Sequence, residues 1–195
     1  MPVIIKKVQK REQLLEPLLR TMRIKKIRPL LEQSSNCILL DIGCGWEARF
    51  LRDVEPYIAW GVGVDSKAPD IQLSKIRTLS CHLEGNLPFD DSIFDVVTML
   101  AVLEHLDHVN AVVAEVYRVL RPGGIFCGTV PSVLAKPVLE FLAYKLNVVN
   151  PDEIRDHKQY YTHLSLQNLM IGAGFATLKH KYFQLGMNNF FVAKK

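Results

Sequence analysis

Two groups of residues in this 195-residue chain could carry chemistry, and the first is a glycine turn between two acids. Asp41 comes directly before Gly43-Cys44-Gly45, and Asp65 ends the next apolar run. Glycines after a strand let the backbone approach a ligand that a Cβ would exclude. A carboxylate at the end of the next strand can accept both ribose hydroxyls. The pattern predicts an adenosine ligand, and the glycine spacing also fits dinucleotide binding.

The second group consists of imidazole and phenol side chains, which hold or transfer protons in many enzymes. His105 follows the fourth predicted strand, while His157, Tyr160 and other polar residues occupy the stretch 150–163. We take His105, His157 and Tyr160 as catalytic candidates. The alternatives are that His105 organises a helix start and that the polar stretch is an ordinary loop. No His/carboxylate set has metal-ligand spacing, so no metal is expected.

These residues depend on apolar runs that alternate between strand-like and helix-like patterns. The N-terminal stretch 9–32 has helical spacing, and Pro17 and Pro29 should break it into pieces. Strands are predicted at 37–42, 58–64, 78–83, 94–100 and 125–130, and helices at 47–54, 110–120, 134–146 and 166–171. This alternation predicts a mostly parallel sheet with helices on both faces.

The end of the chain departs from the alternation. Residues 175–183 and 189–193 both have strand character, and only about five residues separate them. A parallel crossover needs about a dozen residues or more, so the pair must form an antiparallel hairpin. The predicted fold is therefore α/β: a Rossmann-like, doubly wound sheet of about seven strands, mostly parallel, with an antiparallel last strand.

Charge and cysteine content place weaker bounds on function. The first 35 residues hold nine of the basic residues and three of the acidic ones. Such a segment attracts nucleic acid, anionic lipid or an acidic partner, or it is simply a solvated helix face. The four cysteines lack close metal-type pairing and indicate reduced core residues. With no apolar run of about 20 residues and no secretory-type leader, a cytoplasmic location is expected. The oligomeric state stays open.

Several segments together resemble the class I S-adenosylmethionine-dependent methyltransferases, in particular the type 11 group that includes quinone-biosynthesis enzymes. Each segment is weak alone, but their order and spacing are specific. The segments are Leu40-Asp-Ile-Gly-Cys-Gly45, Gly63-Val-Asp65, Leu87-Pro-Phe-Asp-Asp-Ser-Ile-Phe-Asp-Val-Val97, Leu103-Glu-His105 and Glu115-Val-Tyr-Arg-Val-Leu-Arg-Pro-Gly-Gly124. One departure is Glu47, which stands where the family usually has a third glycine.

The resemblance implies a role for each matching residue. Around the methionine part of the cofactor, Asp41 would face the amino group, directly or through water. Gly43, Cys44 and Gly45 would let the backbone pass under the methionine and ribose. Ala101, just after the fourth predicted strand, would offer its carbonyl to the amino group.

Around the nucleoside, the resemblance implies that Asp65 holds the ribose and that Ser66 lies beside the adenine. The family tends to place an acid near the end of the third strand, where it meets the adenine amino group. His82 occupies that place here, with Leu83 and Glu84 next to it. Whether His82 or Glu84 meets the adenine is left open by the spacing.

The length of the chain predicts one domain over 1–195. It would consist of a basic helical segment (1–36), a cofactor-binding core (37–130), over which the resemblance extends, and an acceptor-side region with the hairpin (131–195). The implied reaction is in-line methyl transfer to a small or medium-sized acceptor, which leaves S-adenosylhomocysteine. Asn/Asp-Pro-Pro-Tyr/Phe, the motif of base-amine methylation, is missing, so nucleic acid is a less favoured partner. The alternatives are a nicotinamide-dependent oxidoreductase, which Asp41 argues against, and a non-catalytic S-adenosylmethionine-binding protein.

Overall fold

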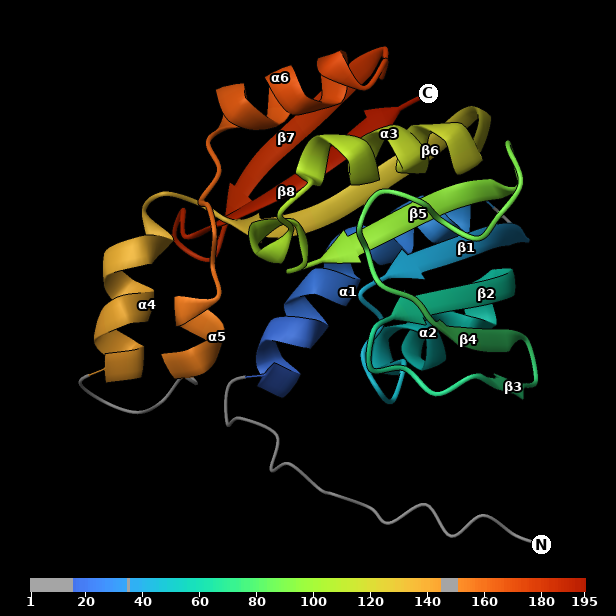
Figure 1. Ribbon diagram of the computed structural model, residues 1–195, viewed down its shortest axis with the longest axis horizontal. Helices are drawn as coiled ribbons and strands as arrows, with labels where there is room; N and C mark the ends of the chain where they lie inside the picture. Colours follow the sequence, from blue (N-terminus) through green and yellow to red (C-terminus); the bar gives the residue numbers. More distant parts are fainter. Residues whose placement is uncertain (1–15, 35, 145–150) are drawn as a thin grey trace, which may run out of the picture.

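One eight-stranded sheet forms the centre of the computed structural model, which describes residues 16–34, 36–144 and 151–195 (Figure 1). Within these residues the strand order is β3-β4-β2-β1-β5-β6-β8-β7. The strands are β1 (Cys37–Ile42), β2 (Ile58–Asp65), β3 (Ile71–Leu73), β4 (Ile76–Ser80), β5 (Phe94–Leu100), β6 (Leu120–Pro131), β7 (Thr177–Phe183) and β8 (Asn188–Lys194). Adjacent strands from β4 to β6 are parallel, so their carboxyl ends share one edge.

Helices cover both faces of this sheet, as the sequence predicts. On one face, Leu39 of β1 packs with Ile27 of α1 and Leu51 of α2. On the other, Leu40 packs in a cluster that includes α3 and α6 residues. The helical elements are α1 (Glu16–Gln33), α2 (Arg49–Val54), η1 (Glu55–Tyr57), η2 (Leu103–His105), α3 (Val109–Val119), α4 (Ala135–Tyr144), α5 (Pro151–Arg155) and α6 (His163–Gly172).

The predicted hairpin is confirmed. β7 and β8 pair antiparallel, and β8 also pairs antiparallel with β6. The far edge carries a strand that the sequence analysis did not predict, since β3 pairs antiparallel with β4 over three residues. α4 and α5 lie together beyond the carboxyl ends of β5 and β6 (Figure 1). These two helices therefore flank the edge at which such sheets bind ligands.

The N-terminal helix differs from its prediction. α1 runs without a break from Glu16 to Gln33 with Pro29 inside it, so the expected break at Pro29 is wrong. Proline removes the hydrogen bond to the carbonyl four residues earlier. That residue, Lys25, is exposed together with Pro29, so water can satisfy the carbonyl. Pro17 lies in the first turn, where a missing N–H is tolerated. Part of the predicted stretch, residues 9–15, lies outside the described residues.

Two strand boundaries also moved. β4 covers Ile76–Ser80 instead of 78–83, which leaves residues 81–84 in the loop that follows it. β6 begins at Leu120 instead of Ile125, because Leu120 already pairs with Phe94 of β5. The end of the predicted helix 134–146 lies outside the described residues. None of the helices in the described part combines the length and apolar content that a bilayer crossing requires.

Candidate functional site

The glycine turn joins the end of β1 to the first turn of α2, and its two glycines do different work. Gly43 and Gly45 adopt φ values of 78° and 69°, in the left-handed region that favours glycine. A Cβ on Gly43 would lie 2.2 Å from Cγ2 of Val102, whereas a Cβ on Gly45 would meet nothing within 4 Å. Gly43 thus permits close packing against the segment after β5, and Gly45 borders open space.

Asp65 ties this turn to the end of β2. Its Oδ2 accepts a hydrogen bond from the Gly45 N–H at 3.1 Å, and its Oδ1 accepts one from the Lys67 N–H at 2.8 Å. Each carboxylate oxygen has two lone pairs, so both retain capacity for a further donor. Ser66, the next residue, is exposed. Asp65 is therefore fixed beside the turn and is able to accept two ligand hydroxyls.

Asp41 lies in β1, and its buried side chain contacts the neighbouring strand β5. The Thr98 hydroxyl donates to its Oδ1 at 2.7 Å, and burial raises the pKa of Asp41 to about 7. Cys44 is also buried, and burial raises the pKa of its thiol, which therefore stays protonated. Thr98 was not identified from the sequence, because nothing in an apolar strand distinguishes a threonine that packs from one that donates to a residue on the neighbouring strand.

The segment after β5 meets the glycine turn from the other side. Ala101 adopts φ 59° and donates its N–H to Thr129 at 2.9 Å. A residue other than glycine adopts this conformation only where its surroundings impose it, and such residues gather at functional sites. The next residue, Val102, is the one that a Cβ on Gly43 would strike. The structure therefore places Ala101 beside the turn formed after β1.

The predicted adenine-side residues lie in the loop after β4. His82 and Glu84 are exposed, and Leu83 is half-buried. The Cys81 N–H donates to the backbone carbonyl of Asp65 at 3.1 Å, which keeps the start of this loop beside the end of β2. Glu47, the residue in the place of the third glycine, is exposed and forms an ion pair with Arg49 at the start of α2.

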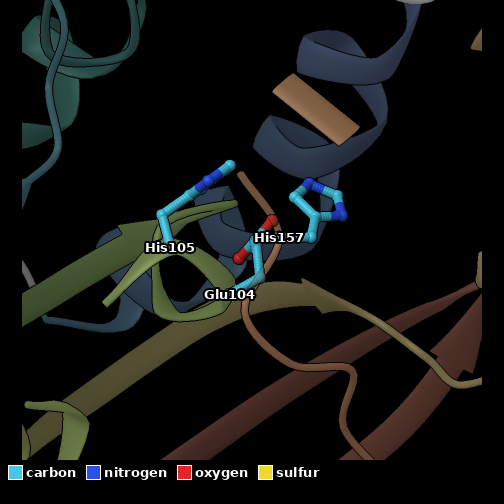
Figure 2. Close-up of side chains that lie close together, drawn as sticks. All are labelled: Glu104, His105 and His157. Carbon is cyan, nitrogen blue, oxygen red and sulfur yellow. The ribbon is translucent and has the colours of Figure 1, made fainter. Parts of the chain in front are cut away.

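The three catalytic candidates lie close together in space, although His105 is far from His157 and Tyr160 in the sequence. The rings of His105 and His157 have centroids 4.8 Å apart, and Nδ1 of His157 lies 3.2 Å from Oη of Tyr160. Figure 2 shows His105 and His157 with Glu104, the residue before His105 in η2. His105 Nδ1 in turn lies 3.0 Å from Oδ2 of Asp156.

Backbone hydrogen bonds hold the His157 segment against η2 and β6. The Lys158 N–H donates to the Glu104 carbonyl at 2.8 Å, and the Tyr161 N–H donates to Pro131 at 3.2 Å. The Tyr161 hydroxyl donates to Leu103 at 3.2 Å. With bonds on both sides, this segment has a defined position at the carboxyl edge of the sheet.

Burial controls the charge of this cluster. Glu104 is 1% exposed, and burial raises its pKa to about 7, against the opposing effects of a backbone hydrogen bond and of the Arg23 charge. Burial, followed by the charge of His105, lowers the pKa of His157 to about 4. Burial also raises the pKa of Tyr160. Near neutral pH, His157 and Tyr160 are therefore uncharged and Glu104 is close to its midpoint.

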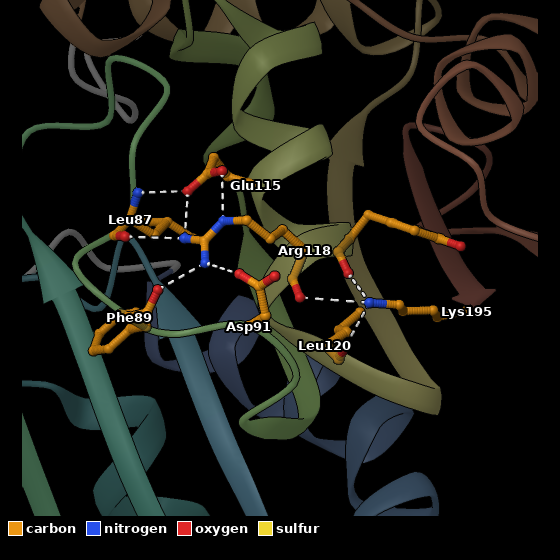
Figure 3. Close-up of polar contacts among 8 residues, drawn as sticks. Leu87, Phe89, Asp91, Glu115, Arg118, Leu120 and Lys195 are labelled. Carbon is orange, nitrogen blue, oxygen red and sulfur yellow. Dashed lines mark hydrogen bonds and ion pairs between the residues drawn. The ribbon is translucent and has the colours of Figure 1, made fainter.

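Hydrogen bonds of Arg118 join two of the segments that resemble the family, 87–97 and 115–124. Arg118 of α3 uses all five of its N–H groups: two bonds to the Glu115 carboxylate, one to Asp91 and one each to the carbonyls of Leu87 and Phe89 (Figure 3). Glu115 also accepts from the Leu87 N–H at 2.9 Å. This network fastens the loop before β5 to α3, and so fixes the strand that leads to Ala101.

The central region of the chain is similar in sequence to known methyltransferases. A type 11 family model described as "Methyltransferase domain" matches residues 40–128. The sterol 4-C-methyltransferase strm-1 of Caenorhabditis elegans is 30% identical over 161 residues, which cover 76% of this chain and 42% of the relative. The ubiquinone/menaquinone biosynthesis C-methyltransferase UbiE of Desulfotalea psychrophila is 34% identical over 118 residues, covering 52% of this chain and 48% of the relative.

Among solved structures, a SAM-dependent methyltransferase from Archaeoglobus fulgidus is similar, with a TM-score of 0.68 and 17% identity over 92% of this chain and 94% of that one. At this identity the likeness concerns the fold. The chain spans less than half the length of the two curated relatives named above.

Proposed function

We propose that this chain belongs to the class I, type 11 methyltransferases, whose family model matches residues 40–128. It would bind S-adenosylmethionine at the glycine turn and transfer the methyl group to a small or medium-sized acceptor. The product would be S-adenosylhomocysteine. One observation carries this proposal: Gly45 borders open space in the turn after β1, and its N–H is bonded to the Asp65 carboxylate at the end of β2. The family model and the relatives named above give no support to a nicotinamide-dependent oxidoreductase.

The residues around that space suit the cofactor. Asp65 has the acceptor capacity for two ribose hydroxyls, and Ser66 with the loop 82–84 would border the adenine. The Ala101 carbonyl and the Asp41 carboxyl would meet the methionine amino group. Bound S-adenosylmethionine supplies an activated methyl group, so the chain's own task is to bind, orient and exclude water.

The acceptor side would be the cluster of His105, His157 and Tyr160, with α4 beside it. We propose that these polar groups hold the reacting end of the acceptor. Large apolar side chains of α4, Val138 and Phe141, are exposed. An apolar body with one polar reacting group fits both features. The relatives named for sterol and quinone methylation support the same class of acceptor.

The remaining proposals follow from the same interpretation. We treat 1–195 as one methyltransferase domain and propose a small-molecule acceptor in preference to nucleic acid. A cytoplasmic location is proposed because the four cysteines of the chain are free thiols and three of them are buried.

The decisive test is calorimetry with S-adenosylhomocysteine. The wild-type chain should bind it, and Asp65→Ala should weaken binding at least tenfold, because charge-assisted hydrogen bonds contribute about 1.5–3 kcal/mol each. The matched control is Asp70→Ala, an exposed acid five residues further along. A folded wild-type chain that binds no S-adenosylhomocysteine would overturn the proposal. Formation of S-adenosylhomocysteine with any of a panel of phenolic, quinol and sterol acceptors would eliminate a non-catalytic role.

A further inference from the structure

Glu104, His105 and His157 form a cluster that the cofactor does not require. Each offers one ligand atom, and these atoms all lie within 4.8 Å of one another (Figure 2). We propose that these three residues bind a divalent transition metal, with Zn²⁺ as the ion whose preferences fit best. Two imidazoles and one carboxylate are a ligand set that zinc accepts, and hard cations such as Mg²⁺ prefer oxygen ligands.

The buried carboxylate is the strongest evidence. Oε2 of Glu104 is buried without a hydrogen-bond partner in the described part of the chain. A buried carboxylate oxygen that lacks a partner is expensive to desolvate, so some group should satisfy it. The positive charge of Arg23 lowers the pKa of Glu104, but no hydrogen-bond donor in the described part of the chain contacts Oε2. A metal ion bound to Oε2 would supply the direct partner that the oxygen lacks.

The hydrogen-bond partners of the two imidazoles also support a metal site. Nδ1 of His105 is paired with the Asp156 carboxylate, and Nδ1 of His157 with the Tyr160 hydroxyl. With Nδ1 of each ring paired in this way, Nε2 of each ring would be the atom that binds the metal. Metal-bound histidines almost always hydrogen-bond through their other ring nitrogen, commonly to a carboxylate, which fixes the ring and its tautomer. Asp156 and Tyr160 would therefore fix the orientation of the two imidazoles toward the metal.

The geometry requires only a small contraction. Zinc–nitrogen bonds of about 2.0–2.1 Å in a tetrahedral site place ligand atoms roughly 3.4 Å apart. The present limit of 4.8 Å means that the most distant pair must approach by roughly an ångström or more, within reach of side-chain rotation. The Lys158 N–H bond to the Glu104 carbonyl already holds the two segments together. Three protein ligands leave a fourth position open, as in catalytic zinc sites.

The open position defines the class of acceptor, and this step rests on the proposed function. A metal-bound hydroxyl ionises at lower pH than a free one. We expect the acceptor to carry a phenolic or enolic hydroxyl that binds at this position. The hydroxyl proton would pass to solvent water, which makes the oxygen, or the adjacent ring carbon, a better nucleophile. That atom would bond to the methyl carbon as the methyl–sulfur bond breaks and leaves S-adenosylhomocysteine, and a methylated ring carbon would then release its own proton to solvent. The site thus suits acceptors whose reacting atom is activated by loss of a hydroxyl proton.

The test uses Zn²⁺ alone with the metal-free, full-length chain, measured by calorimetry and by metal analysis after dialysis. Wild type should bind one Zn²⁺ per chain, and His105→Gln and His157→Gln should each weaken binding at least tenfold. His163→Gln is the matched control, because His163 and His180 form the other close imidazole pair, with ring centroids 4.8 Å apart. Substitution of Co²⁺ adds a visible absorption spectrum that the two cluster variants should lose.

Three results would overturn the proposal: no Zn²⁺ binding by wild type, binding unchanged in both cluster variants, or loss of binding only in His163→Gln. S-adenosylhomocysteine binding to the metal-free chain is measured separately and should be retained in the cluster variants. The metal site and the proposed function can therefore fail independently. Melting curves of each variant identify any loss of binding that results from unfolding.

Discussion

Comparing Gly45→Ala with Gly123→Ala separates an effect on ligand binding from an effect on stability, because the two glycines have similar structural surroundings. Both glycines have left-handed φ values, 69° and 80°, and a Cβ on either would meet nothing within 4 Å. Each N–H donates one hydrogen bond of 3.1 Å, to Asp65 and to Lys195 respectively. They differ in location, since Gly123 lies in the turn that precedes the buried part of β6, away from the carboxyl edge of the sheet.

The expected loss of stability is the same for both variants. Alanine in the left-handed region costs about 1–2 kcal/mol, and neither site adds a steric clash. For a chain of this size that corresponds to roughly 2–4 °C in melting temperature for each kcal/mol. Affinity for S-adenosylhomocysteine should differ: the Gly45 methyl group enters the proposed cofactor space, so binding should fall at least tenfold, or about 1.4 kcal/mol. Gly123→Ala should bind as wild type does.

Urea unfolding and calorimetry measure the two quantities on the same samples. Equal affinity in Gly45→Ala and Gly123→Ala would show that the open space beside Gly45 is not where the cofactor lies. A much larger stability loss in Gly45→Ala than in Gly123→Ala would contradict the structural match on which the comparison depends.

Two further predictions concern the supporting structure. Arg118→Met should lower the free energy of unfolding by about 2–3 kcal/mol, because it removes two hydrogen bonds to the Glu115 carboxylate, one to Asp91 and two to loop carbonyls. Arg121→Met, at a more exposed pair, should lower it by less than about 1 kcal/mol, and equal losses in urea unfolding would contradict this. Asp41 has a folded pKa raised to about 7, so the folded state holds more protons than the unfolded state between about pH 4 and 7, and Asp41 makes the chain less stable as pH rises through that range. Asp41→Asn should flatten this part of the stability profile, Asp70→Asn should not, and an unchanged profile in Asp41→Asn would refute the assignment.

The features that the sequence predicted well are those whose signal is local. The apolar run of β1 and the Gly43–Gly45 spacing together define a strand and a turn, and both are present. The hairpin was predicted from the length of the connection between two strands, because about five residues cannot make a parallel crossover. The predicted helix break at Pro29 was wrong because it depends on a non-local property. The helix continues if water can reach the Lys25 carbonyl, and the sequence does not show whether it can.

The features that the sequence did not predict depend on tertiary contacts. Glu104 and His105 are adjacent, but His157 joins them only because the Tyr161 segment pairs with β6 and η2. No ligand spacing marks such a cluster, and the expectation of no metal rested on spacing. Thr98 of β5 likewise donates its hydroxyl to Asp41 of the neighbouring strand β1. The sequence shows these two strands only as separate apolar runs and does not show that they are paired.

The short segment from Ala101 to His105 connects the proposed cofactor site to the proposed acceptor site. Ala101 directly follows β5 and has a left-handed conformation, and Val102 packs into the space that Gly43 leaves. η2 follows at once and presents Glu104 and His105. One end of this segment therefore contacts the glycine turn, and the other carries the groups proposed to hold the acceptor. In-line transfer requires donor and acceptor to be held in fixed alignment, and five consecutive residues anchored by a parallel strand meet that requirement.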